Sequence, residues 1–189
     1  MSYDDFINVA LDAAVLAGEK IMEVYNASEH IDFESKNDNS PLTIADKKSH
    51  DTIVSMLKKT RTHIISEESE SIDYKIRKKW KEYWLIDPLD GTKEFIKKNG
   101  EFTVNIALIK NNSPFIGIVY CPVKKILYWN DSNKNVFKKI IGKEKKQLNK
   151  RKKIDQVKKN LRVIVSRSHL NEDTTQYIKK LNDPQLISC

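Results

Sequence analysis

The chain has 189 residues, a formal net charge of +8 and a pI of about 9.3. This length can bury one good core, or one domain and part of a second. The only cysteines are Cys121 and Cys189, which excludes a disulfide framework and is typical of a reduced cytosolic protein. Acids near the start argue against a secretory signal, and no apolar run is long enough to cross a membrane, so we expect a cytoplasmic protein.

Two helices are predicted in the first third of the chain. Residues 4–25 carry apolar side chains at helical spacing, which indicates an amphipathic helix that faces a core. An extended segment at 41–46 leads into a second helix over 45–59, and Asp46 lies in its first turn.

Two short strands with acidic ends follow. Residues 63–69 are an apolar strand that ends in carboxylates, Glu67 among them. Residues 84–86 are a second apolar strand, and Pro88 should interrupt regular pairing beyond it. We therefore expect the chain to turn over residues 87–91.

The rest of the chain is rich in strand signals. Apolar or aromatic runs at 103–109, 115–121 and 126–129, separated by turn residues, predict an antiparallel meander. Together with the two helices they indicate a layered α+β domain. A further strand at 161–166 and a helix at 172–181 should begin a smaller α/β domain.

The turn after residue 86 carries the chemistry. Asp87 and Asp90 are three residues apart, so a tight turn can bring both carboxylates and the Leu89 carbonyl together. These hard oxygen ligands suit Mg²⁺. Gly91 permits close backbone approach, and amides at the start of a helix at Thr92 would point at an anion. A metal and a phosphate group are therefore expected to share this corner.

An Asp-x-x-Asp pattern by itself is usually only a turn. Here Glu67 and Asp46 supply two further acidic ends of strands or helices, which favours the functional interpretation. The alternative for Asp46 is an acid that complements its helix dipole, which contributes only about 0.3 to 1 kcal/mol.

These segments, in this order and over essentially the whole chain, resemble the lithium-sensitive, magnesium-dependent phosphatase superfamily that includes inositol monophosphatase. The resemblance implies a layered αβαβα sugar-phosphatase-like fold with a mostly antiparallel sheet flanked by helices. It also implies two or more Mg²⁺ ions, inhibition by Li⁺, and metal ligands at Glu67, Asp87, Leu89 and Asp90.

The residues after Thr92 point to one branch of this superfamily. Inositol monophosphatases typically continue with Gly-Thr-Thr-Asn-Phe, whereas this chain has Gly91-Thr92-Lys93-Glu94-Phe95. That segment resembles the 3'(2'),5'-bisphosphate nucleotidase branch of CysQ type. The run at 165–169 is similar to the strand end that contacts the nucleotide there, so Ser166 and His169 are candidate nucleotide contacts. The alternative is a helix cap, with Ser168 or Asn171 capping the helix at 172–181.

The resemblance implies a reaction that needs no covalent phosphoenzyme. Metal-activated water would hydrolyse the 3'-phosphate of adenosine 3',5'-bisphosphate to AMP and phosphate, with Asp46, Glu67 and Thr92 as catalytic residues and Thr92 and Asp46 positioning the water. An inositol monophosphatase or another small phosphomonoester phosphatase is the near alternative. The residues expected to bind substrate are Glu67, Leu89, Asp90, Gly91, Thr92, Ser166 and His169.

A basic run offers a rival interpretation. Residues 138–159 contain eleven Lys or Arg against two acids. Such a run could bind RNA or DNA through phosphates. It lacks interleaved aromatics and is mostly Lys, so a solvated connecting face is favoured and no specific nucleic-acid partner is expected. The positive field could gather an anionic substrate or touch the inner membrane peripherally.

The expected domain order is an α+β metal- and phosphate-binding domain over 1–139, a basic connecting segment over 140–160, and the start of an incomplete α/β domain over 161–189. Full members of the superfamily continue into a substrate loop and a Trp-Asp segment whose Asp completes the metal site. We therefore expect a C-terminally truncated form with impaired activity.

Overall fold

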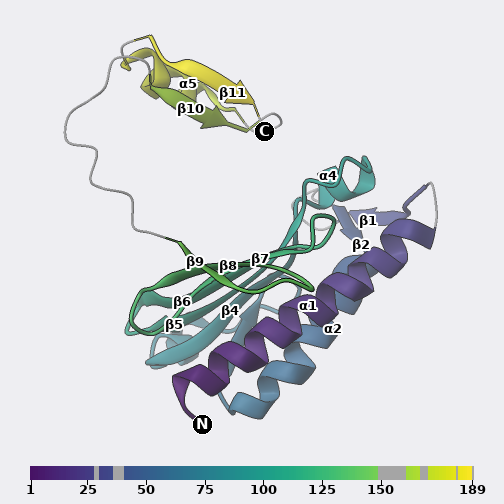
Figure 1. Ribbon diagram of the computed structural model, residues 1–189, viewed down its shortest axis with the longest axis vertical. Helices are drawn as coiled ribbons and strands as arrows, with labels where there is room; N and C mark the ends of the chain where they lie inside the picture. The colour runs from purple at the N-terminus through teal and green to yellow at the C-terminus, as the bar shows by residue number, and fades with distance from the viewer. Residues whose placement is uncertain (28–29, 36–40, 149–160, 167–169, 182, 189) are drawn as a thin grey trace. The chain divides into compact units, whose positions relative to one another are not determined.

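A computed structural model describes residues 1–27, 30–35, 41–148, 161–166, 170–181 and 183–188. The chain divides into two compact units, an N-terminal unit over Met1–Asn149 and a C-terminal unit over Lys150–Cys189 (Figure 1). Along the described residues, none of the helices combines the length and apolarity needed to cross a bilayer.

A seven-stranded sheet forms the centre of the N-terminal unit. Its strands lie side by side in chain order: β3 (His63–Ser66), β4 (Glu82–Asp90), β5 (Thr103–Lys110), β6 (Ser113–Cys121), β7 (Ile126–Asn130), β8 (Val136–Ile140) and β9 (Lys146–Leu148). Only the β3–β4 pair is parallel, and every other neighbour is antiparallel. The predicted meander is confirmed, as is a mostly antiparallel sheet flanked by helices.

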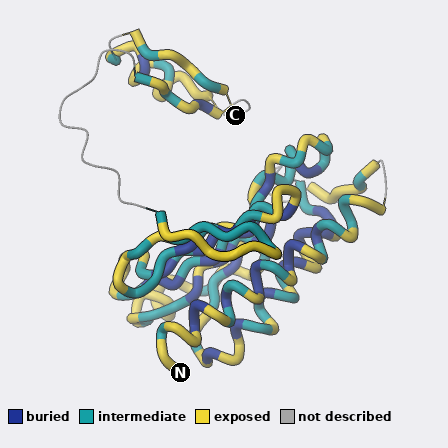
Figure 2. The backbone as a smooth tube through the Cα atoms, viewed as in Figure 1, coloured by how far each residue is buried: buried dark blue, intermediate teal, exposed yellow. Residues whose placement is uncertain are grey.

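Two helices, α1 (Tyr3–Ala27) and α2 (Ile44–Leu57), cover one face of this sheet (Figure 1). The buried stripe of α1 is made of small side chains, with Ala10, Ala14 and Ala17 fully buried. At Gly18 an added Cβ would lie 2.3 Å from Cε1 of Tyr120, so glycine permits close contact with β6. Figure 2 shows the buried residues concentrated between the helices and the sheet.

Short elements complete the N-terminal unit. A hairpin of β1 (Phe33–Ser35) and β2 (Pro41–Thr43) precedes α2, and the 3-10 turn η1 (Lys58–Thr60) follows it. The helix α3 (Tyr74–Arg77) precedes β4, and α4 (Thr92–Ile96) follows it. Because α4 contacts β2, the end of β4 lies close to the start of α2.

The course of β4 corrects one prediction. We expected the chain to turn from Asp87 onward, but β4 continues through Pro88 to Asp90. The ladder with β5 pairs Asp87 with Asn105 and Asp90 with Thr103, with a bulge between these two pairs. Proline therefore interrupts the pairing without ending the strand. The turn comes at Gly91, whose φ of +93° begins α4.

The C-terminal unit is a small α/β motif. It contains β10 (Arg162–Val165), α5 (Glu172–Lys179) and β11 (Gln185–Ser188), and the two strands pair in parallel. Asn171 caps α5 by accepting a hydrogen bond from the Thr174 amide at 2.8 Å. The predicted strand and helix are present, and Asn171 is one of the two caps that the sequence offered.

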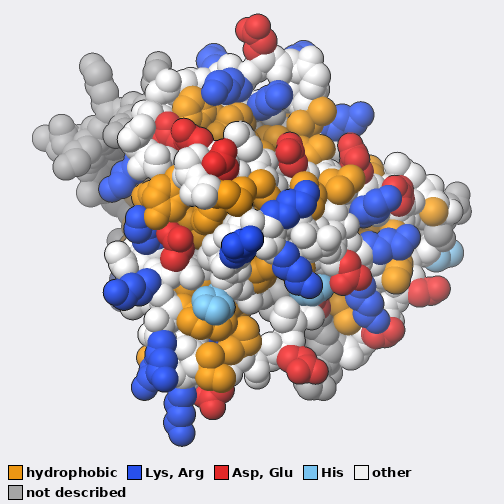
Figure 3. All heavy atoms as spheres, turned by 90° about the horizontal axis from the view of Figure 1, so that it is seen from below, with side chains coloured by type: hydrophobic (Ala, Val, Ile, Leu, Met, Phe, Trp, Pro, Cys, Tyr) orange, Lys and Arg blue, Asp and Glu red, His pale blue; other side chains and the backbone are white. Residues whose placement is uncertain are grey.

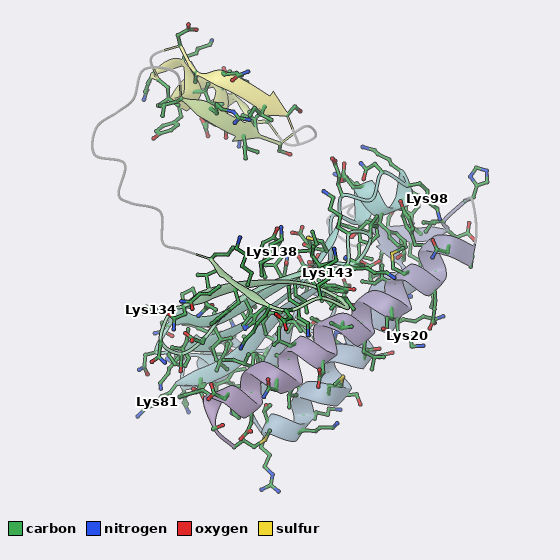
Figure 4. The ribbon with its side chains drawn as sticks, in the orientation of Figure 1. Lys20, Lys81, Lys98, Lys134, Lys138 and Lys143 are labelled. Atoms are coloured by element: carbon green, nitrogen blue, oxygen red, sulfur yellow. The ribbon has the colours of Figure 1, made fainter. Side chains whose placement is uncertain are left out.

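The basic run 138–159 begins inside the sheet. Its first part contains the end of β8 and all of β9, so the boundary predicted after residue 139 falls within a strand, and residues 149–160 lie outside the described residues. Figure 4 labels lysines from well-separated parts of the sequence: Lys20 lies on α1 and Lys138 on β8, whereas Lys81, Lys98, Lys134 and Lys143 lie between elements. Figure 3 shows blue and red side chains interspersed on the face in view, without a continuous basic patch there.

Candidate metal and phosphate site

Two parallel strands bring the predicted carboxylates to one corner. Because β3 and β4 run in the same direction, their carboxyl ends meet at the same edge, with Ser66 opposite Ile86. The amide of Glu67 donates to the Ile86 carbonyl at 3.1 Å. The next residues on the two strands, Glu67 and Asp87, are therefore neighbours although twenty positions separate them in sequence.

Asp87 carries the strongest electrostatic signal of this corner. Burial raises the pKa of its carboxyl to about 7, with further contributions from the negative charges of Glu67 and Asp90 and from a hydrogen bond with Glu67. Its Oδ1 atom is buried and has no hydrogen-bond partner among the described residues. A buried acceptor without a donor, beside a second carboxyl group, is an environment that a cation would stabilise.

The other predicted oxygen ligands, at Leu89 and Asp90, lie shortly after Asp87 in the sequence. The Leu89 carbonyl accepts from the Thr92 hydroxyl at 3.1 Å. The Asp90 carboxylate is exposed, and its Oδ2 accepts from the Asn105 side-chain amide at 3.0 Å. Over the described part of the chain, no three His, Cys, Asp or Glu side chains form a ready metal-binding group by themselves. The donors gathered here are carboxylates and a backbone carbonyl.

Asp46 reaches this corner from the start of α2. It is only 1% exposed, and its Oδ1 accepts from the Thr92 hydroxyl at 3.2 Å. Its Oδ2 accepts from the Thr43 amide at 2.7 Å, which closes a capping box at the helix start. The two oxygens of Asp46 therefore have different partners, one at the helix start and one at Thr92, and its expected catalytic role stays a prediction. Burial raises the pKa of Asp46, while the hydrogen bonds from Thr43 and Thr92 oppose that rise.

Gly91 allows the chain to pass from β4 into α4 within one residue. Its φ is +93°, and an added Cβ would lie 2.8 Å from the Glu101 carbonyl oxygen. The first amides of a helix have no acceptor within the helix. The structure thus places Gly91 and Thr92 next to Asp46, Leu89 and the carboxylates, as expected from the sequence.

Two predicted nucleotide contacts belong to the C-terminal part of the chain. Ser166 directly follows β10 in the C-terminal unit and is exposed, while His169 lies outside the described residues. Their expected contact with substrate stays a prediction.

The sequence reasoning missed several supporting side chains. They are Ser49 and His50 on α2, Ser66 at the end of β3, and Asn105 on β5. Spacing offered a partial signal for the first two, since Ser49 and His50 follow Asp46 by three and four residues and so share its face of α2. For Ser66 and Asn105 only the strand register supplies the information.

The N-terminal unit also has a groove that the predicted site residues do not line. A groove of about 1000 Å³ between α1 and strands β7 and β8 is lined by residues such as Leu11, Val15, Trp129 and Phe137. None of the predicted site residues lines it, so its size does not make it the candidate site.

Comparisons with known proteins show the family of this chain. The pattern of the inositol monophosphatase family matches residues 2–188. This chain belongs to the inositol monophosphatase family.

Within this family, the chain is similar to proteins that are bisphosphate nucleotidases. The chain is 39% identical over 173 residues to the 3'(2'),5'-bisphosphate nucleotidase CysQ of Salmonella typhimurium, covering 91% of this chain and 68% of that protein. It is 42% identical over 167 residues to the CysQ nucleotidase of Buchnera aphidicola, covering 87% of this chain and 60% of the relative.

Solved structures share the fold. The crystal structure of CysQ from Bacteroides thetaiotaomicron, described as a bacterial member of the inositol monophosphatase family, matches with a TM-score of 0.75 and 44% identity, covering 95% of this chain and 70% of that one. The IMPase of Thermotoga maritima has a TM-score of 0.74 at 17% identity, with 97% and 68% of the two chains covered, which shows the fold alone.

Proposed function

We propose that this corner hydrolyses the 3'-phosphate of adenosine 3',5'-bisphosphate to AMP and phosphate. The observation that carries the proposal is that the Asp46–Thr92 hydrogen bond lies at the same strand end as Oδ1 of Asp87, which is buried and has no hydrogen-bond partner within the described part of the chain. The choice of substrate rests on relatives of 39–44% identity that are bisphosphate nucleotidases or CysQ proteins. The chain is thus a phosphoric monoester hydrolase of this family.

The side chains present fit Mg²⁺. Glu67, Asp87 and Asp90 would hold it with their carboxylates and Leu89 with its carbonyl, because Mg²⁺ prefers hard oxygen donors. The raised pKa of Asp87 and its unpartnered oxygen are the features expected of a carboxyl group that gains a cation on binding. When bound, such ions supply positive charge that neutralises the phosphate and the leaving oxygen.

Thr92 and Asp46 would position the attacking water. The Thr92 hydroxyl has one proton and two acceptors within reach, Oδ1 of Asp46 at 3.2 Å and the Leu89 carbonyl at 3.1 Å. When that proton goes to Asp46, the lone pairs of Oγ1 are left to accept a hydrogen bond from water. Burial of Asp46 raises its pKa, which makes it a better proton acceptor than an exposed carboxylate. The amides of Gly91 and Thr92 would donate to the phosphate oxygens.

Phosphate release tests the function directly. The full chain should release phosphate from adenosine 3',5'-bisphosphate with Mg²⁺, faster than from inositol monophosphate, and Li⁺ should inhibit. Thr92→Val and Asp46→Asn should each lower kcat by about 10² to 10⁴ because they remove the hydroxyl or the proton acceptor.

Thr52→Val on α2 is the matched control, since its hydroxyl donates only to the Lys48 carbonyl within the helix. Equal or faster turnover of the inositol ester would overturn the nucleotidase assignment. Full activity of Thr92→Val would overturn its role, and no turnover by the folded chain would reject the phosphatase proposal for these 189 residues.

A further inference from the structure

We propose that Ser49 and His50 of α2 are positioning residues, which set the spacing between the strand ends that carry Glu67 and Asp87. Neither residue belongs to the predicted site, and neither contacts the predicted reacting atoms. The inference rests on the proposed function, because it assumes that the carboxylates of these strand ends act together on a metal ion.

Ser49 holds the bulge of β4. Its side chain is fully buried, and its hydroxyl donates to the Pro88 carbonyl at 2.7 Å across 39 positions in sequence. Pro88 lies where the β4–β5 ladder has no paired residues, between the pairs made by Asp87 and Asp90. The serine therefore anchors the carbonyl group of Pro88 to the helix. Pro88 lies between Asp87 and Leu89, which are both predicted metal ligands.

His50 holds the end of β3. Its Nδ1 lies 2.8 Å from the hydroxyl of Ser66, which is buried at the last position of the strand. The same hydroxyl accepts from the Glu68 amide at 3.3 Å. A hydroxyl that accepts from an amide can give its own proton to Nδ1, which favours the histidine tautomer protonated on Nε2. Glu67 lies between Ser66, which carries this hydroxyl, and Glu68, whose amide donates to it.

One face of α2 thus contacts three separate segments. Asp46, Ser49 and His50 follow each other at helical spacing, and their partners are Thr92, Pro88 and Ser66. Each partner lies within one residue of a predicted ligand or is itself a predicted water-positioning residue. Because α2 makes hydrogen bonds to both strand ends, it fixes the distance between their carboxylates, as supporting hydrogen bonds do in known metal sites.

Direct metal binding by the full chain tests this inference. We expect Ser49→Ala and His50→Ala each to weaken Mn²⁺ binding, measured by electron paramagnetic resonance, by about tenfold, since loss of supporting hydrogen bonds typically costs 10- to 100-fold. His50→Asn should largely restore affinity, because the asparagine side chain presents a polar atom near the position of Nδ1.

Thr60→Val is the matched control for a buried hydroxyl. Thr60 is 8% exposed and accepts from the Trp84 indole at 3.0 Å, but it lies in η1, beyond the C-terminal end of α2 and away from the carboxylates. The Thr60→Val substitution should lower thermal stability, measured by circular dichroism, without changing Mn²⁺ affinity.

The outcomes separate this inference from the proposed function. If the unmodified chain binds Mn²⁺ and the Ser49 and His50 variants bind it equally well, the positioning role is overturned while the function stands. If Thr60→Val lowers Mn²⁺ affinity as much as the Ser49 and His50 variants do at an equal loss of stability, the two residues are merely structural. If the folded, unmodified chain binds no Mn²⁺, both proposals fail.

Discussion

At the scale of single residues, Asp87 is the most informative position in the chain. A carboxyl group is usually ionised at neutral pH, yet burial and two neighbouring acids raise the pKa of this one to about 7. The proton that it retains occupies the place where the proposed function puts a cation. Proton and cation should therefore compete for the same carboxyl group.

This competition predicts a pH dependence of stability. In the unfolded chain the pKa of Asp87 is near 3.8, the ordinary value of an aspartate, whereas burial and the neighbouring acids raise it to about 7 in the folded chain. Between these two pH values the folded chain binds one proton more than the unfolded chain at this residue. The contribution of Asp87 to the free energy of unfolding is therefore fully present below the lower pKa and is lost as pH rises through the higher one. Asp46 acts in the same direction, because its pKa is also raised.

Urea unfolding from pH 4 to 8 without divalent ions measures this slope. We expect Asp87→Asn to flatten it and saturating Mg²⁺ to reduce it, whereas Asp12→Asn on the exposed face of α1 should leave it unchanged. A slope that is identical in Asp87→Asn would show that the raised pKa is not the cause.

At the scale of elements, the passage from β4 to α4 positions most of the site. A bulge at Pro88 and Leu89 and a left-handed Gly91 convert a strand into a helix within a few residues. The carboxylates lie before the turn and Thr92 directly after it, so the turn determines whether they share one corner.

A pair of glycine substitutions tests this turn. Gly91 and Gly142 have similar positive φ angles of +93° and +83°, but an added Cβ meets the Glu101 carbonyl at 2.8 Å only at Gly91 and meets nothing within 4 Å at Gly142. Gly142→Ala should cost about 1 to 2 kcal/mol, from its φ angle alone. Gly91→Ala should cost more and should also reduce phosphatase activity. Equal losses of stability with full activity in both variants would contradict the importance of this turn.

At the scale of the whole molecule, the two units differ in how well each could be stable alone. The hydrophobic core cluster lies entirely within Met1–Asn149, and all three tryptophans belong to that unit. The C-terminal unit is close to the size below which domains usually need disulfides, metals or partners.

We therefore expect residues 1–149 to fold without the rest of the chain. Their tryptophan fluorescence should report an unfolding midpoint in urea within a few tenths of a molar of that of the full chain, because no residue of the core cluster is removed. A broad or absent transition in the shorter chain would show that the C-terminal unit supports the core.

Local patterns determined much of this protein in advance. Apolar or aromatic runs between turn residues predicted strands β5 to β7, and helical spacing of apolar residues predicted α1. An extended segment leading to Asp46 predicted the start of α2, and the turn residues around Asp87, Asp90 and Gly91 predicted oxygen ligands beside a phosphate. These features depend on periods of two to four residues, which a sequence displays directly. The family assignment followed from motifs of the same local kind.

Tertiary structure alone decided how these parts meet. The parallel pairing of β3 with β4 places Glu67 beside Asp87, and α2 reaches both strand ends through Ser49 and His50. The bulge that carries β4 past Pro88 depends on its pairing with β5, so the proline predicted the interrupted ladder but not the continued strand. Sequence determines the chemistry of each side chain, whereas the partners and the burial that raises the pKa of Asp87 exist only after distant segments have packed together.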